Sequence, residues 1–204
     1  MRKKLFSSIV WVVALLAGGR DLAWSHDPKP SVLEKGAPRR QVHLPIKDFS
    51  LTDHEGRAFE FGALKGKLVV VGFIYTSCPD VCPLITSSMR AAQRSLNGKE
   101  RKSVYFLSIT TDPEIDSPEV LKSYGRRYEV DFSNWSFLTG DLKALAPVWK
   151  AFGVKVERKA RGLVNHTALA ALIDGGGVMR FAYLGTSPDP KKVVQDMRAL
   201  FARP

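Results

Sequence analysis

Two cysteines, Cys78 and Cys82, are the only ones in the chain and lie four positions apart. They directly follow the apolar run 68–74, which is typical of a buried strand, and the residues 81–96 after them have the pattern of a helix. Both thiols are therefore expected at the N-terminus of a helix, where the helix dipole and unpaired N–H groups favour the thiolate. Thiolates bind soft metal ions and attack disulfides. The pair therefore predicts metal or redox chemistry.

A structural disulfide is the alternative interpretation of this pair, because exported proteins commonly contain one. The loop that it would close between Cys78 and Cys82 is very short. On the chain-entropy argument such a loop stabilises a fold by only about 2 kcal/mol. A chain of 204 residues can bury a core without that cross-link. A functional role is therefore favoured.

The first 25 residues have the pattern of a secretory signal peptide, in which three basic residues precede the apolar run 5–19 and Ala23-Trp24-Ser25 follows. The run is short for the roughly 30 Å hydrocarbon core of a membrane, so a cleaved signal is favoured over a short anchor. We expect cleavage after Ser25. Both interpretations export the chain, either to the periplasm or to an inner-membrane anchor facing the periplasm.

The formal net charge is +11, but the basic residues form no block and are not interleaved with aromatic residues at any one place. Nucleic-acid binding therefore has little support, whereas an anionic membrane surface or an acidic protein face is a plausible contact. Residues 26–47 are rich in proline and lack an apolar period, so they are predicted to be a tether, with His26 and His43 exposed to solvent.

The remaining residues, 48–204, predict one α/β domain. Strands alternate with helices along most of it, and a hairpin and a helix end it. The expected strands are 49–52, 59–61, 68–74, 104–109, 135–138, 168–173 and 178–183, and the expected helices are 81–96, 118–128, 142–152 and the segment from 190 onward. This order predicts a thioredoxin-like fold, with an N-terminal β-hairpin and a central mixed sheet flanked by helices.

The segment 76–83, Thr-Ser-Cys-Pro-Asp-Val-Cys-Pro, resembles the Cys-x-x-x-Cys-Pro signature of the Sco/SenC family. These are thioredoxin-like proteins implicated in cytochrome c oxidase assembly. Three further stretches are similar to family motifs in the same order, namely 111–124, 135–141 and 165–174. The resemblance covers about residues 46–204. One departure is Asn165, which stands where the family usually has an acidic residue just before its histidine.

The resemblance implies that Cys78, Cys82 and His166 are metal ligands. Two thiolates and an imidazole suit copper as Cu(I) or Cu(II), and zinc is the main competitor for such a set. The implied function is that of a copper metallochaperone that helps assemble the dinuclear copper centre of cytochrome c oxidase. Its expected partners are the copper-accepting oxidase subunit and a thiol reductant such as a thioredoxin-like protein, because a disulfide cannot bind copper.

Two alternatives use the same cysteines without copper delivery. The pair could form a thiol-disulfide oxidoreductase or a peroxide-consuming enzyme, in which Cys78 and Cys82 would be catalytic, or a redox sensor whose disulfide switches a partner surface. Three acids near the motifs, Asp80, Asp112 and Asp116, are explained by helix-start, turn and cap roles and are left out of the predicted site.

Overall fold

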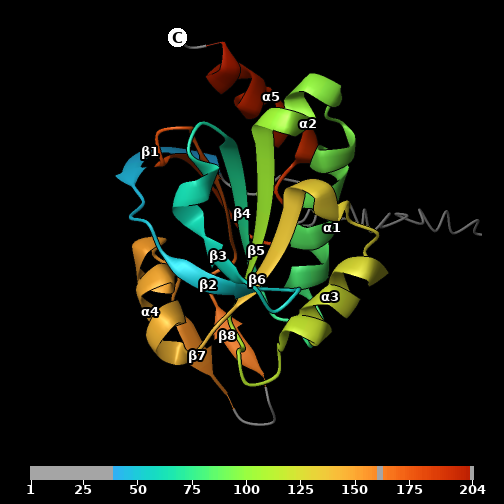
Figure 1. Cartoon of the computed structure of the whole chain (residues 1–204), viewed down its shortest axis with the longest axis vertical. Coiled ribbons are helices and arrows are strands. Elements are labelled where there is room, and N and C mark those ends of the chain that lie inside the picture. The colour runs from blue at the N-terminus through green and yellow to red at the C-terminus, as the bar shows by residue number, and fades with distance from the viewer. Residues whose placement is uncertain (1–38, 160–162, 203–204) are drawn as a thin grey trace, which may run out of the picture. The chain divides into compact units, whose positions relative to one another are not determined.

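The computed structural model describes residues 39–159 and 163–202. The predicted signal 1–25 and the first part of the predicted tether lie outside the described residues. The core of the domain is an eight-stranded mixed sheet in the order β1-β10-β9-β4-β5-β6-β2-β3 (Figure 1). Its strands are β1 (Arg39–Pro45), β2 (Ser50–Asp53), β3 (Ala58–Glu60), β4 (Leu68–Ile74), β5 (Val104–Thr110), β6 (Trp135–Thr139), β9 (Leu169–Ile173) and β10 (Val178–Leu184). The hairpin β2–β3 and the mixed sheet confirm the predicted fold class.

Helices cover both faces of this sheet (Figure 1). Side chains on one face of β4, such as Val70 and Ile74, pack with the helices α1 (Val81–Arg94), α3 (Pro118–Arg127) and α5 (Pro190–Phe201). Side chains on the other face pack with α4 (Leu142–Ala151) and the 3-10 helix η2 (Phe61–Leu64). All seven residues of β4 are buried, which explains its unbroken apolar sequence.

The strand pairings bring three chain segments to one edge of the sheet. Strand β4 is parallel to β5, so the carboxyl ends of both strands lie at the same edge. Strand β9 is antiparallel to β4, so its first residues also lie at that edge. The turn after β4, the turn after β5 and the segment before β9 are therefore neighbours in space. The first of these contains Cys78, and the last contains His166.

The prediction of a tether over residues 26–47 is wrong for its C-terminal part. Residues 39–45 form β1, which pairs antiparallel with β10 at the edge of the sheet. Ile46, directly after this strand, is buried and joins the core. The pattern was missed because most side chains of β1 are exposed, so the strand shows no apolar alternation. His43 is exposed, as expected.

Besides the 3-10 helices, three short elements were not predicted. Helix α2 (Gly98–Ser103) follows directly on a capping box, in which Asn97 and Glu100 each accept a backbone hydrogen bond from the other. Strands β7 (Val156–Arg158) and β8 (Val164–His166) form a separate two-stranded sheet. Each has only three residues, which is too short for a periodic signal. Helix α4 continues through Pro147, although an interior proline usually breaks or kinks a helix.

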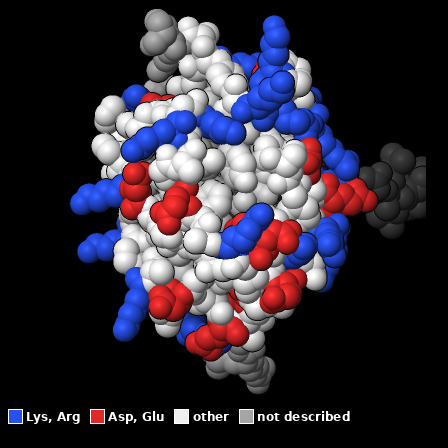
Figure 2. Space-filling view, in the orientation of Figure 1, with Lys and Arg blue, Asp and Glu red and all other residues white. Residues whose placement is uncertain are grey.

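The surface has charges of both signs. On the face shown in Figure 2, acidic groups lie among the lysines and arginines and several gather toward its lower part. Within residues 39–159 and 163–202, no helix has the length and apolar character needed to cross a membrane.

A buried ion pair joins β1 to the last helix. The Nε of Arg39 donates to Asp196, whose side chain is almost fully buried and also accepts from the Tyr183 hydroxyl at 2.8 Å. Burial opposes ionisation of Asp196, but the bonds from Arg39, Tyr183 and Lys192 outweigh it and lower its pKa. The carboxylate therefore stabilises the fold above its unfolded-state pKa of about 4, and this stabilisation is lost as pH falls through the lower folded-state value.

We predict that Asp196→Asn lowers the free energy of unfolding by about 3 kcal/mol at neutral pH, because Arg39 then lacks its charged partner. The deficit should shrink as pH falls below about 4, where the unfolded chain takes up a proton at Asp196, and should disappear below the lower folded-state pKa, where the native Asp196 is itself protonated. Urea unfolding followed by circular dichroism at both pH values measures this difference. Glu129→Gln, at a side chain that is 70% exposed, is the control and should change little. An equal deficit at both pH values would contradict the electrostatic explanation.

Candidate metal centre

The two cysteines lie where the sequence predicted, at the junction of β4 and α1. Cys78 is in the connecting turn and is half-buried, whereas Cys82 is the second residue of α1 and is fully buried. No disulfide joins them. The backbone N–H of Cys82 donates to Cys78 Sγ at 3.5 Å, and the N–H of Tyr75 donates to Cys82 Sγ at 3.4 Å. Backbone donors therefore hold both sulfur atoms in place at the start of the helix.

His166 joins the cysteines from the far end of the chain. Its Nε2 lies 3.6 Å from Cys82 Sγ, although 84 positions separate the two residues. Its Nδ1 lies 3.1 Å from the carbonyl oxygen of Thr167. A carbonyl oxygen only accepts hydrogen bonds, so this contact favours a proton on Nδ1 and leaves the Nε2 lone pair facing the sulfur. This is the tautomer that a metal ligand needs.

The two thiols have opposite acidities. A hydrogen bond from the Cys82 thiol, with further bonds from backbone N–H groups and the Tyr75 hydroxyl, lowers the pKa of Cys78 to about 5. Donating that bond raises the pKa of Cys82 far above its ordinary value, and burial adds to the effect. The site at neutral pH therefore holds one half-buried thiolate and one buried thiol.

Burial lowers the pKa of His166, so its imidazole is neutral at neutral pH, the form that binds metals. Cys78 and His166 also line a shared hollow of about 370 Å³, together with Tyr75, Pro79 and Asn165. An ion or an incoming ligand can therefore reach both groups from the same side. The Cys78 sulfur and the His166 imidazole thus share one solvent-accessible hollow.

The three side chains are neighbours, but they do not form a closed metal cage. In the part of the chain that the structure describes, no group of three or more His, Cys, Asp or Glu side chains converges closely enough to hold a metal ion. Two soft sulfurs and one imidazole nonetheless fit copper by donor chemistry. Simultaneous ligation by all three therefore requires their donor atoms to move closer together.

Tyr75 lies within the site but is not among the residues that the sequence predicts for it. Its ring packs edge-on against the His166 ring, with 5.8 Å between centroids. Its N–H donates to Cys82, and its carbonyl accepts the N–H of Cys78 at 3.2 Å. One residue thus contacts all three predicted ligands. Its place directly before the Thr-Ser-Cys sequence was the only available signal.

The turn and cap explanations for Asp112 and Asp116 are wrong. Asp116 is fully buried and accepts hydrogen bonds from the N–H and hydroxyl of Thr76 and from the hydroxyl of Thr110. It therefore fixes the turn that carries Cys78. Burial raises the pKa of Asp116, and the pKa of Asp112 is raised for the same reason. Sequence spacing gave no sign of these contacts, because Thr76 and Asp116 are 40 positions apart.

Asp80 and Asn165, near the predicted ligands in the sequence, are both exposed at the surface. Asp80 is the N-cap residue of α1 but is exposed, and its side chain makes no capping bond. Asn165 is exposed on β8, opposite Glu157 of β7. The acidic residue Glu157 therefore occupies the position across the ribbon from Asn165.

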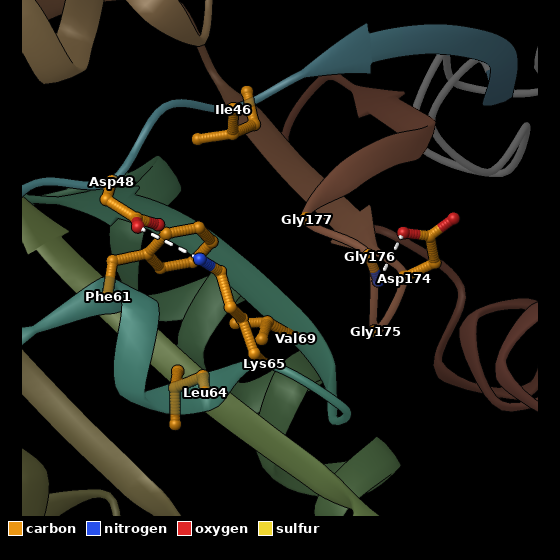
Figure 3. A pocket seen from close by; sticks show the side chains of 10 residues that line it. All are labelled: Ile46, Asp48, Phe61, Leu64, Lys65, Val69, Asp174, Gly175, Gly176 and Gly177. Carbon is orange, nitrogen blue, oxygen red and sulfur yellow. Dashed lines mark hydrogen bonds and ion pairs between the residues drawn. The ribbon is translucent and has the colours of Figure 1, made fainter.

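A second pocket, of about 250 Å³, lies toward the other end of β4 (Figure 3). Its carboxylates are already partnered within the protein. Asp48 lies 3.3 Å from Lys65 Nζ, and Asp174 accepts the N–H of Gly176 and the guanidinium of Arg180. No cysteine or histidine is among its lining residues. It therefore lacks the soft donors of the site at the cysteines.

Comparison with known proteins gives a consistent family signal. A model of the SCO1/SenC family matches residues 38–202. A SCO1/SenC family lipoprotein from Bacillus anthracis is 33% identical, with a TM-score of 0.72 over 79% of this chain and 98% of that one. BsSco, described as a cytochrome c oxidase assembly protein of the Sco family with a disulfide switch, is 26% identical, with a TM-score of 0.70 over 81% and 98%.

A third solved structure, of yeast Sco1 with copper bound, is 28% identical, with a TM-score of 0.67 over 80% of this chain and 91% of that one. The match to these structures confirms the fold class that the order of elements predicted.

We predict that iodoacetamide alkylates native Cys78 with a half-maximal rate near pH 5, because the thiolate is the reactive form. Cys82→Ala should move this midpoint upward, since it removes the strongest hydrogen bond to the thiolate, and Tyr75→Phe should move it upward by less. Mass spectrometry of single alkylation over a pH series measures the midpoint. Tyr105→Phe is the matched control, because that hydroxyl bonds Ser136 instead. A midpoint near the ordinary thiol value of about 8.5 would refute the predicted thiolate.

Proposed function

The chain belongs to the SCO1/SenC family, and from that premise we propose that it binds copper through Cys78, Cys82 and His166 and delivers it to a cytochrome c oxidase subunit. The observation that carries the proposal is the contact of Cys82 Sγ with His166 Nε2 beside the Cys78 thiolate. Relatives that are named for oxidase assembly or solved with copper bound support it.

Copper is the cargo in this proposal, so binding must be reversible. Cys78 is already ionised and is half-buried, which makes it the first ligand that an incoming ion meets. Cys82 must lose its proton to become the second ligand, and His166 is neutral and ready to bind. The open hollow beside Cys78 and His166 leaves room for a thiolate of the acceptor to form a shared intermediate before release.

The proposed location is outside the cytoplasm, in the periplasm or at a membrane surface facing it. The signal-like pattern of residues 1–25 supports this, and the relative from Bacillus anthracis is described as a lipoprotein. Such a compartment oxidises thiols, so a reductant must keep Cys78 and Cys82 available for copper. A thioredoxin-like reductant is the proposed second partner, beside the oxidase subunit.

The unequal acidities of the two thiols favour a second candidate function, thiol-disulfide exchange. The Cys78 thiolate would attack a disulfide of the partner and release one partner thiolate. Cys82 would then lose its proton and attack the Cys78 sulfur, which releases the second partner thiolate and leaves the Cys78–Cys82 disulfide. The same disulfide would serve the redox-sensor alternative.

The first test is Cu(I) titration of the reduced protein against a chromogenic chelator. We expect one copper per chain, at least tenfold weaker binding in Cys78→Ser and in His166→Ala, and negligible binding after oxidation to the disulfide. His43→Ala is the matched control, because this exposed histidine lies on β1 and should not matter. Unchanged affinity in His166→Ala would remove that residue from the site, and no tight copper binding at all would move thiol exchange to first place.

The second test is genetic. Deletion of the gene should lower oxidase activity in copper-limited medium, because the acceptor subunit then lacks its copper source. Added copper should restore part of the activity, and a Cys78→Ser copy should not complement. Metal analysis of purified oxidase measures the loading directly. Full copper loading in the copper-limited deletion strain would rule out delivery as the function.

A further inference from the structure

The strand that carries His166 is not part of the main sheet. β8 pairs with β7 as a two-stranded ribbon of three residues per strand, at the lower end of the molecule in Figure 1. Two-stranded ribbons of this size have little stability of their own in water. The position of His166 over the cysteines therefore depends on its chain connection to β9, which begins at Leu169, and on the side chains that attach this ribbon to the rest of the domain.

One attachment is apolar and the other is ionic. Val156 of β7 packs against the hydrophobic side chains of both faces of the main sheet, and Val164 of β8 is buried. The ionic attachment is Arg158, at the end of β7, whose guanidinium contacts the Asp112 carboxylate and lies 3.2 Å from Glu114. The Asp112 side chain is 0% exposed, so Arg158, which is itself 39% exposed, joins the ribbon to a buried group of the domain.

Asp112 depends on this contact. Its Oδ1 accepts from Arg158, whereas its Oδ2 is buried and has no hydrogen-bond partner among the described residues. Separating the Asp112–Arg158 pair would leave a buried carboxylate without any partner, which is strongly unfavourable. The paired arrangement is therefore the stable one. The ribbon is thereby held at one fixed point on the domain.

The same short segment also holds the cysteine turn. The carbonyl oxygen of Asp112 accepts the N–H of Asp116 at 2.9 Å, and the Asp116 carboxylate binds Thr76, two positions before Cys78. Residues 112–116 therefore contact the ribbon with His166 on one side and the turn with Cys78 on the other. Register within the ribbon completes the link, since Arg158 pairs with Val164 and Val156 pairs with His166.

We propose that Arg158 is a positioning residue for the metal centre, whose ion pair with Asp112 sets the place of His166 relative to the two cysteines. It touches none of the three ligands and acts through the ribbon. The inference rests on the proposed function for its metal-binding consequence, but the position of His166 is a property of the metal-free protein. Loss of the pair should release the histidine while the two thiols, held by backbone donors, stay together.

The test compares the purified full chain with Arg158→Gln, Asp112→Asn and Arg158→Lys. In the metal-free protein, both charge-removing variants should show faster hydrogen exchange over 156–167 and a shifted His166 ring resonance by NMR. Copper affinity should fall roughly 10- to 100-fold, the usual loss when a group that orients a ligand is removed. The Cu(II) spectrum should lose nitrogen coupling while the thiolate-to-copper absorption persists. Arg158→Lys should restore part of each signal.

Two comparisons keep the result interpretable. Arg198→Gln breaks another ion pair between an arginine and a carboxylate, with Glu100 between α5 and α2, and should leave every signal unchanged. Asp112→Asn buries no charge, so it should fold even if Arg158→Gln does not. Unchanged exchange and an unchanged His166 resonance in the folded variants would overturn the inference. These readouts need no metal, so they decide it even if the unaltered protein fails to bind copper and the proposed function falls.

Discussion

The pairing of the buried strand β4 with both its neighbours is the constraint on which the site depends. Because β5 runs parallel to β4 and β9 runs antiparallel, the end of β4, the end of β5 and the start of β9 must share one edge of the sheet. Each of the three connections contains side chains of a different chemical type. The first contains Cys78 and leads into the helix with Cys82, the second contains two buried carboxylates, and the third contains His166. No single local element could assemble this set.

At that edge, the electrostatics of the thiols follow from their depth. Cys78 is half-buried in the turn and receives hydrogen bonds, so its charged form is stabilised, whereas Cys82 is buried within the first turn of α1 and keeps its proton. The asymmetry suits copper delivery and thiol exchange alike, since each begins with one accessible thiolate. The two functions differ in their need for His166, whose Nε2 lies 3.6 Å from Cys82 Sγ. Thiol exchange does not require this imidazole, whereas a copper site uses it as a ligand.

The carboxylates beneath the site show how a small domain holds a turn and a ribbon in place without regular secondary structure between them. Asp116 binds Thr76 in the cysteine turn, and Asp112 binds Arg158 in the ribbon. Burying two acids so close together is unfavourable, and the pKa of each is raised by that burial. The hydrogen bonds of the two acids offset the unfavourable free energy of their burial, but only while the turn and the ribbon keep their positions. Burial of the acids therefore favours the one arrangement in which both have their partners.

The sequence by itself determined the elements and half of the site. Long apolar runs and helical periods located the strands and helices of the α/β core except β1 and the short elements, and the Cys-x-x-x-Cys-Pro segment located the thiols. Resemblance to a family, rather than any local pattern, pointed to His166. The tertiary structure alone decided the rest. Strand β1 is polar and pairs with β10 far along the chain, and the ribbon strands are too short for periodicity. The buried acids find partners 40 and 46 positions away. Periodicity records which face of an element is buried, but a contact between distant segments exists only once the sheet has set their order in space.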